Sequence, residues 1–353
     1  MKTIHVPALR PYNVHIAPGL LANAGAMVRE AVPGASRAAI ITDRNVEALY
    51  LAPVLRSLEV AEFEAASFSI PPGEASKSAE NYLSLLNWLC EQSITRTDVI
   101  IALGGGVVGD LAGFAAATYL RGVRDIQLPT TLLAMVDSSV GGKTGIDLPG
   151  GKNLAGAFHQ PALVLCDTDT LDTLPGEVFR DGAAEVIKYG MLSSPTLLEE
   201  LKGDAWRTQL EEVIAGCVTI KRDIVCQDEF DTGQRMLLNF GHTIGHAVEK
   251  LSDYGVSHGA AVAIGMATDT RAALKKGLCP PECLSALEGL LALHGLPDST
   301  GFSPRELFEA ALSDKKRAGG QITIVTPREL GRCELITMPV PELLHWIEAG
   351  VSQ

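Results

Sequence analysis

The sequence predicts an α/β protein of two domains, with an N-terminal Rossmann-like α/β domain at residues 1–176 and a mostly α-helical C-terminal domain at residues 177–353. Three observations support this prediction. The chain has 353 residues, enough for about two domains. Before residue 177, short β-branched apolar runs alternate with longer amphipathic stretches, as expected of strands and helices around a largely parallel sheet. After Pro175, helical periodicity dominates.

The individual elements follow from these patterns. In the first half we expect strands at residues 38–42, 66–70, 98–103, 125–128 and 163–167, and helices at 45–58, 78–92 and 111–120. In the second half we expect helices at residues 177–191, 206–226, 241–251 and 260–276, and strands at 321–325 and 333–336. A cleft between halves of different architecture is an expected place for a ligand.

Composition limits the possible partners. Lys and Arg total 29 against 42 Asp and Glu, and the net charge of −13 disfavours binding to nucleic acid or to an anionic membrane surface. The longest apolar stretch, residues 103–120, contains Asp110 and five glycines, so it is not expected to span a bilayer. The seven scattered cysteines are typical of reduced thiols. The close pair Cys279 and Cys283 is interpreted as part of a turn before a helix. We therefore expect a cytoplasmic protein.

A glycine-rich turn follows the predicted strand at residues 98–103. It consists of Gly104, Gly105, Gly106, Val107, Val108, Gly109 and Asp110, and it leads into a predicted helix. In this strand–turn–helix context, G-x-G-x-x-G lets backbone N–H groups approach a pyrophosphate, which indicates a dinucleotide site. The hexad alone is not specific. Asp125 lies at the start of the next strand, so Asp43, which ends an earlier strand, is the better candidate for binding a ribose.

A second glycine-rich segment contains Lys143 and Lys152, which are nine residues apart and flanked by glycines. Both ammonium groups can face one phosphate because the neighbouring positions lack side chains. The pattern differs from a Walker A loop. Solvated lysines on flexible loops are the alternative interpretation, but the density of turn glycines favours a phosphate site.

Three histidines lie close together in the second half. His242 and His246 are one helical turn apart, and His258 follows 16 residues after the first. Glu185, on a separate predicted helix, offers a carboxylate. Two imidazoles and a carboxylate leave an open coordination position on zinc, which is typical of a catalytic site. Spacing alone favours His242 and His246 as the imidazole pair, and hydrogen-bonded core histidines are the alternative.

Lys188 also has two interpretations. It could form a surface ion pair with Glu185, three residues earlier, worth about 0.2–0.5 kcal/mol. Its neighbours Val186, Ile187, Tyr189 and Met191 are largely apolar, however, so a lysine held there is expected to have an anionic partner.

Taken together, these motifs resemble one enzyme family. The set is Gly104–Asp110, Leu120–Gly122, Leu128–Thr131, Val136–Gly145, Gly151–Asn153, Phe158–Gln160, Ala184–Gly190, Leu238–His246 and His258–Gly259. It resembles 3-dehydroquinate synthase, of the sugar-phosphate cyclase superfamily, from about Asp43 to Lys316. The resemblance implies an NAD- and zinc-dependent lyase, with cobalt as a substitute, acting as a homodimer. Enzymes of this family convert 3-deoxy-D-arabino-heptulosonate 7-phosphate into 3-dehydroquinate and phosphate. The steps are transient oxidation at C5, phosphate elimination, re-reduction and aldol closure.

The resemblance also implies residue roles. Glu185, His242 and His258 would bind the metal, in place of the pair favoured by spacing. The phosphate would be held by Lys143, Asn153, His246, Lys315 or Lys316, and Arg121 of the partner subunit. Lys188, Lys221, Arg235 and Asn239 would hold the carboxylate and hydroxyl end of the substrate. The NAD site would contain Asp43, Glu74, Lys77, the turn 104–110, Thr130, Thr131, Asp137, Ser138, Lys143, Lys152, Thr170, Leu171 and Thr173.

Two positions depart from the family pattern. Ala260 stands where the family has Glu two residues after the second metal histidine, and Gly176 replaces an Arg after Leu174-Pro175. If the missing carboxylate orients a ligand, its loss lowers metal affinity or rate by about 10- to 100-fold. The alternative functions are an aminodehydroquinate synthase-like cyclase, a metal-dependent polyol dehydrogenase, and a non-catalytic nucleotide-binding relative.

Overall fold

The computed structural model describes residues 1–315 and 320–351, and the chain divides into two compact units. The first contains Met1–Pro175 and Ile214–Phe230, and the second contains Gly176–Val213 and the chain from Asp231 onward. The first crossing lies within one residue of the predicted boundary. The segment Ile214–Phe230 groups with the first unit instead of the second, because helix α8 (Leu210–Gln227) continues from one unit into the other.

A seven-stranded sheet forms the centre of the first unit, in the order β1-β2-β9-β6-β5-β3-β4. Only the β1–β2 pair is antiparallel, and the other neighbours are parallel. A strand that is covered on both faces consists of a nearly continuous run of apolar residues. Its position can therefore be predicted from the sequence. The bounds are β1 Lys2–Val6, β2 Tyr12–Ala17, β3 Arg37–Asp43, β4 Glu64–Ile70, β5 Val99–Gly104, β6 Arg124–Pro129 and β9 Leu163–Asp167.

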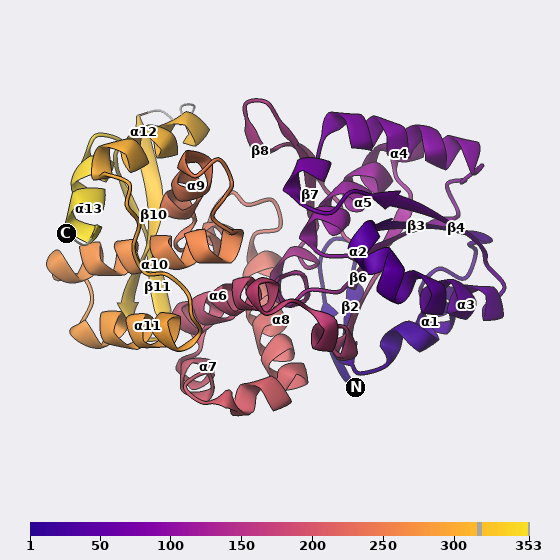
Figure 1. The fold of residues 1–353 in the computed structure, drawn as a ribbon, viewed down its shortest axis with the longest axis horizontal. Coiled ribbons are helices and arrows are strands. Elements are labelled where there is room, and N and C mark those ends of the chain that lie inside the picture. The colour runs from indigo at the N-terminus through magenta and orange to yellow at the C-terminus, as the bar shows by residue number, and fades with distance from the viewer. Residues whose placement is uncertain (316–319, 352–353) are drawn as a thin grey trace. The chain divides into compact units, whose positions relative to one another are not determined.

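Helices cover both faces of this sheet (Figure 1). Ile40 and Ile101 pack toward α1 (Ala24–Ala31) and α3 (Ala52–Val60), whereas Ile41 and Ile100 pack toward α4 (Ala79–Glu91) and α5 (Gly106–Thr118). Alternate side chains of each strand thus supply two hydrophobic cores. Short helical segments connect these elements: Leu20–Asn23, α2 Arg44–Val46, Glu47–Leu51, Glu74–Ser76, Tyr119–Arg121, Ala134–Ser138 and Thr168–Thr173.

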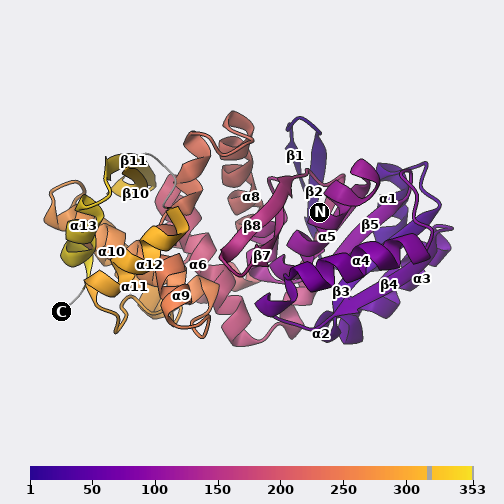
Figure 2. The same ribbon diagram turned by 90° about the horizontal axis from the view of Figure 1, so that it is seen from above.

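A β-hairpin absent from the predicted elements packs against α5 (Figure 2). Its strands are β7 (Lys143–Leu148) and β8 (Gly151–Phe158). The glycines of this segment, interpreted from sequence as loop residues, allow close approach of backbones. A Cβ atom on Gly156 would lie 2.1 Å from the carbonyl oxygen of Thr144.

The second unit is mostly helical, with one antiparallel ribbon of β10 (Gln321–Glu329) and β11 (Arg332–Pro339) that contacts α10 and α6. Its helices are α6 Gly176–Ser193, α7 Pro195–Glu200, the segment Asp204–Thr208, the segment Gln234–Asn239, α9 His242–Leu251, α10 His258–Lys275, α11 Pro281–Leu293, α12 Pro304–Lys315 and α13 Glu342–Gly350. The predicted fold class is confirmed. Within the described residues, no helix is both long and apolar enough to cross a membrane.

Candidate active site

The predicted cofactor residues of the first unit gather at the carboxyl edge of its parallel strands. Asp43 ends β3, Gly104 ends β5, and Thr130 follows β6. The Thr130 N–H donates to the Gly104 carbonyl at 3.0 Å. The Asp43 carboxylate accepts hydrogen bonds from the N–H groups of Asn45 and Val46 at 2.9 and 3.2 Å, so it caps α2. In open α/β sheets, this edge is where ligands bind.

The glycine turn lies between β5 and α5, as predicted, and is tightly packed. A Cβ atom on Gly105 would lie 3.1 Å from Thr131 Cγ2, and one on Gly106 would lie 3.0 Å from Ser138 Oγ. The structure therefore brings the turn together with Thr131 and Ser138, both predicted to belong to the same site. The N–H groups at the start of α5 form the kind of N-terminus at which a pyrophosphate binds.

Lys77 connects several predicted residues in the first unit. Its ammonium is buried and lies 2.8 Å from Asp110 Oδ2 and 3.5 Å from Glu74 Oε1, and it donates to Asn153 Oδ1 at 2.5 Å. Burial alone would lower the pKa of Lys77, but Asp110 and Glu74 outweigh it and raise the pKa. The lysine is therefore a fixed positive charge.

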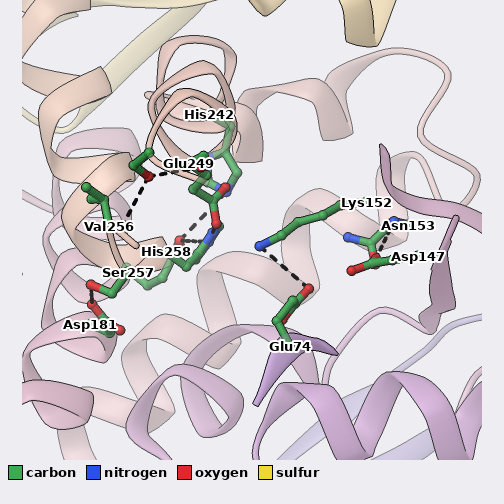
Figure 3. Close-up of polar contacts among 12 residues, drawn as sticks. Glu74, Asp147, Lys152, Asn153, Asp181, His242, Glu249, Val256, Ser257 and His258 are labelled. Atoms are coloured by element: carbon green, nitrogen blue, oxygen red, sulfur yellow. Dashed lines mark hydrogen bonds and ion pairs between the residues drawn. The ribbon is translucent and has the colours of Figure 1, made fainter. Parts of the chain in front are cut away.

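Two further contacts extend this network (Figure 3). Lys152 Nζ lies 3.6 Å from Glu74 Oε1, and the Asn153 N–H donates to Asp147 Oδ1 at 2.8 Å. Asp147 was not predicted. It lies on the β7–β8 hairpin, so without that hairpin the sequence gives no sign that it faces these residues.

Residues predicted for two different roles meet at Lys221. Its ammonium donates to the carbonyl oxygen of Asp137 at 2.7 Å and pairs with the carboxylate of the same residue. Near the end of β9, the segment containing Thr170, Leu171 and Thr173 contacts Tyr50, whose hydroxyl lies 2.5 Å from Thr173 Oγ1. Lys143 begins β7, and Arg121 lies in an exposed turn.

In the second unit, three helices bring Glu185, His242 and His258 together (Figure 3 shows both histidines). Glu185 lies on α6, and the two histidines are the first residues of α9 and α10. One ligand atom from each residue lies within 4.8 Å of the others. Glu185 Oε1 is 3.7 Å from His242 Nε2 and 3.3 Å from His258 Nε2.

Each imidazole has an acceptor on its other nitrogen. His242 Nδ1 donates to the carbonyl oxygen of Phe240 at 3.1 Å, which leaves the lone pair on Nε2. His258 Nδ1 lies 3.5 Å from Glu249 Oε1. Outer partners of this kind orient histidine ligands toward a metal. Burial, followed by the charges of Lys188 and His258, holds the pKa of His242 well below its usual value, so this imidazole is neutral.

The burial of Glu185 fits a bound cation. Its side chain is fully buried. Among the described residues, neither carboxylate oxygen accepts a hydrogen bond of good geometry. Lys188, His242 and His258 nevertheless lie within ion-pair distance of the carboxylate. Burial alone would lower the pKa of His258, but the carboxylates of Glu185 and Glu249 outweigh it and raise the pKa to about 10. A site that stabilises a proton this strongly in a buried position suits a divalent cation.

The remaining predicted residues of the second unit have mixed outcomes. Lys188 is buried and pairs with Glu185, so the surface ion-pair interpretation is wrong and the expected anionic partner is present. His246 forms a second possible metal group with Glu249 and His258, without His242. Arg235 is buried in the segment Gln234–Asn239, which ends at Asn239 shortly before His242. Lys316 lies outside the described residues, and Lys315 ends α12.

Comparisons with known proteins identify the family of the chain. The family models "3-dehydroquinate synthase N-terminal" and "3-dehydroquinate synthase C-terminal" match residues 67–181 and 182–317. A 3-dehydroquinate synthase of Enterococcus faecalis (strain ATCC 47077 / OG1RF) is 43% identical over 357 residues, which covers 99% of each chain. One of Paracoccus denitrificans (strain Pd 1222) is 44% identical over 363 residues, again 99% of each.

Solved structures show the same fold. The 2-epi-5-epi-valiolone synthase of Streptomyces hygroscopicus subsp. jinggangensis 5008, with NAD⁺ and Zn²⁺ bound, is 26% identical with a TM-score of 0.86 over 96% of each chain. An iron-containing alcohol dehydrogenase, 16% identical with a TM-score of 0.69 over 96% of this chain and 97% of its own, shares the fold alone. The chain thus has the fold that is found both in this 2-epi-5-epi-valiolone synthase and in this iron-containing alcohol dehydrogenase. Within that class it belongs to the 3-dehydroquinate synthase family, and the predicted resemblance is confirmed.

Proposed function

We propose that this protein is a 3-dehydroquinate synthase. It converts 3-deoxy-D-arabino-heptulosonate 7-phosphate into 3-dehydroquinate and inorganic phosphate, and is thus a carbon–oxygen lyase. The observation that carries the proposal is the group of Glu185, His242 and His258, in a chain of this family that also has a glycine turn of dinucleotide-binding type. Family membership supports the reaction, and these two sites support the chemistry that it needs.

The proposed cofactors are NAD⁺ and a zinc or cobalt ion. Zinc and NAD⁺ are bound in the related 2-epi-5-epi-valiolone synthase structure, which supports the same pair here. When bound, NAD⁺ supplies a reversible hydride acceptor, and the metal supplies a positive charge that stabilises an oxygen anion. Glu185, His242 and His258 would hold the metal, and the turn 104–110 with Asp43, Thr131 and Ser138 would hold the nucleotide.

The cationic side chains of the site suit a substrate with two anionic ends. In the second unit, Lys188 and Arg235 are both buried, at 1% exposure each. A guanidinium shielded from water binds a carboxylate strongly, which fits the carboxylate end of the proposed substrate. The proposed phosphate partners are Lys143, Asn153 and His246, with Arg121 from a partner subunit. These residues position the substrate, and correct positioning accounts for much of the rate of elimination and aldol closure.

The cellular setting is proposed on composition. The seven cysteines are free, which suits a reducing cytoplasm. The net charge of −13 argues against nucleic-acid and membrane partners. A homodimer is proposed because the family resemblance implies that Arg121 acts in the site of the neighbouring subunit.

The proposal is tested by following phosphate and NADH in one sample. Purified protein with Zn²⁺ and a catalytic amount of NAD⁺ should release one phosphate per heptulosonate phosphate consumed, with no net NADH. Accumulation of NADH without phosphate would instead support a polyol dehydrogenase. A parallel assay with the amino analogue of the substrate separates the aminodehydroquinate alternative, which would turn over that analogue faster.

A further inference from the structure

We propose that Asp181 is a positioning residue for His258, which holds the start of helix α10 against helix α6. This inference rests on the proposed metal-dependent function. It is independent of the residues already assigned to the site, because Asp181 belongs to none of the predicted sets.

The start of helix α10 is held by Asp181. His258 is the first residue of α10, and the preceding Ser257 does not cap the helix with its own side chain. The Ser257 hydroxyl donates instead to Asp181 Oδ1 at 2.5 Å (Figure 3). Asp181 therefore ties the residue that precedes α10 to helix α6.

Close backbone packing makes this connection stiff. A Cβ atom on Gly259 would lie 2.3 Å from the Cα atom of Asp181 and 2.5 Å from its carbonyl oxygen. Helices α6 and α10 therefore approach each other at this point as closely as a glycine permits. His258 lies between Ser257 and Gly259 in the chain. Both of these neighbours contact Asp181, so the position of the His258 imidazole is fixed from both sides.

The same helix supplies the clamp and a metal ligand. Asp181 and Glu185 are four residues apart on α6, which places them on one face of that helix. By fixing the start of α10 to α6, Asp181 sets the position of His258 Nε2 relative to Glu185 Oε1, now 3.3 Å away. A small displacement of this helix start would open the group of ligand atoms.

The charge at the start of α10 supports this role. Ala260 carries no carboxylate, although an acid at the first turn of a helix stabilises the positive end of the helix dipole. Asp181 places a carboxylate at the same helix start from outside the helix. A Glu at position 260 would lie three residues after Ser257, the spacing of a capping box, which predicts that it can replace the Asp181 carboxylate at this helix start.

The experiment measures zinc affinity by competition with a chromophoric chelator, using the full chain stripped of metal. The variants are Asp181→Ala, Asp181→Asn and the double variant Asp181→Ala/Ala260→Glu. We expect Asp181→Ala to weaken zinc binding by about 10- to 100-fold, the range for lost outer-sphere partners. Asp181→Asn, whose amide oxygen still accepts a hydrogen bond, should lose less, and Ala260→Glu should restore most of the affinity to the double variant.

Glu306→Gln is the matched control. Glu306 accepts hydrogen bonds from Ser303 N and Oγ at 2.8 and 2.6 Å at the start of α12, so it performs a similar capping task in the same unit without a metal ligand beside it. Its zinc affinity should equal that of the unsubstituted protein. The visible spectrum of bound Co²⁺ is the second measurement, because it reports ligand geometry and is unaffected by a loss of stability alone.

The outcomes separate this inference from the proposed function. If the unsubstituted protein binds neither zinc nor cobalt, the proposed function fails. If it binds zinc and Asp181→Ala binds equally well with an unchanged cobalt spectrum, the positioning role is wrong while the function stands. Should Asp181→Ala not fold, wild-type affinity and spectrum in Ser257→Ala, which removes the hydroxyl that donates to Asp181, would overturn the role, and so would an equal loss of affinity in Glu306→Gln.

Discussion

At the scale of single residues, two overlapping groups compete for a metal, and substitution separates them. Glu185 and His242 occur only in one group, His246 and Glu249 only in the other, and His258 in both. We expect Glu185→Gln to abolish bound zinc and His246→Ala to retain it, because the buried Glu185 carboxylate has no hydrogen-bond donor in good geometry among the described residues. Elemental analysis of the purified variants measures this. Zinc that is retained in Glu185→Gln and lost in His246→Ala would show that the metal binds to the second group, His246, Glu249 and His258.

Asp98 provides a residue-scale prediction about stability. Its carboxylate accepts hydrogen bonds from Thr95 N, Thr95 Oγ1, Ser36 N and Arg37 N at 2.7–3.1 Å. Burial alone would raise the pKa of Asp98, but these hydrogen bonds outweigh it and hold the pKa below its usual value. The resulting stabilisation is present above the pKa of the unfolded carboxyl, about 4, and is lost as the pH falls through the lower folded pKa.

Asp98→Asn should therefore lower the free energy of unfolding by about 2 kcal/mol near neutral pH. The difference in the free energy of unfolding between the variant and the unsubstituted protein should decrease as the pH falls below about 4. Urea unfolding followed by circular dichroism at several pH values measures both effects. Glu91→Gln, at an exposed acid that ends α4, is the control and should change little. A gap independent of pH would contradict the pKa argument.

Some of these residues are visible in the sequence and others are not. Glu185 and the histidines are chemically distinctive, but spacing alone selects His246 over His258, because the choice depends on how α9 and α10 are packed. Asp181, Asp147 and Glu249 give no signal at all. Their roles come from contacts between segments that lie apart in the chain, 76 residues in the case of Asp181 and Ser257.

At the scale of elements, buried strands are predictable and the β7–β8 hairpin is not. Strand β9 matches its predicted range because a continuous apolar run is long enough to identify it. Strand β8 of the hairpin has only exposed and half-buried residues, and the hairpin contains several glycines, so its pattern is that of a loop. Its glycines allow neighbouring backbones to pack closely, and local secondary-structure propensity does not reveal this need.

A pair of glycine substitutions tests this interpretation of packing. A Cβ atom on Gly113 of α5 would lie 2.4 Å from Thr144 Cγ2 of the hairpin, whereas nothing lies within 4 Å of one on Gly216 of α8. Gly113→Ala should reduce the free energy of unfolding by about 1–2 kcal/mol through overpacking. Gly216→Ala should raise it by about 0.5–1 kcal/mol because alanine favours helix. Equal effects in thermal or urea unfolding would contradict the close approach of α5 and β7.

At the scale of the whole molecule, the sequence predicts two domains but not their full composition. The boundary near residue 176 coincides with a change of periodicity, which is a local signal. The grouping of Ile214–Phe230 with the first unit has no such signal, since one helix continues across the division. Lys221 lies in this segment and contacts Asp137. A prediction that places a single domain boundary near residue 176 assigns these two residues to different domains and so misses their contact.

The proposed dimer gives the last prediction. Arg121 and Leu120 both have left-handed backbone conformations, with φ of 65° and 50°, and the Leu120 carbonyl accepts a hydrogen bond from Arg96 at 2.9 Å. Non-glycine residues held in this conformation commonly mark functional positions. Arg121 is exposed at this strained turn, as expected of a side chain that reaches a neighbouring subunit.

If Arg121 acts in the site of its partner, two inactive variants should restore each other. Arg121→Ala and His246→Ala homodimers should each be severely impaired. A refolded equal mixture contains hybrid dimers in which one site has both residues, so the mixture should recover up to about a quarter of full activity. Phosphate release measures this recovery, and a mixture of Arg121→Ala with Lys143→Ala should behave in the same way. Activity that stays at the mean of the two homodimers would show that Arg121 serves its own subunit, because an arginine acting within one chain gains nothing from a hybrid.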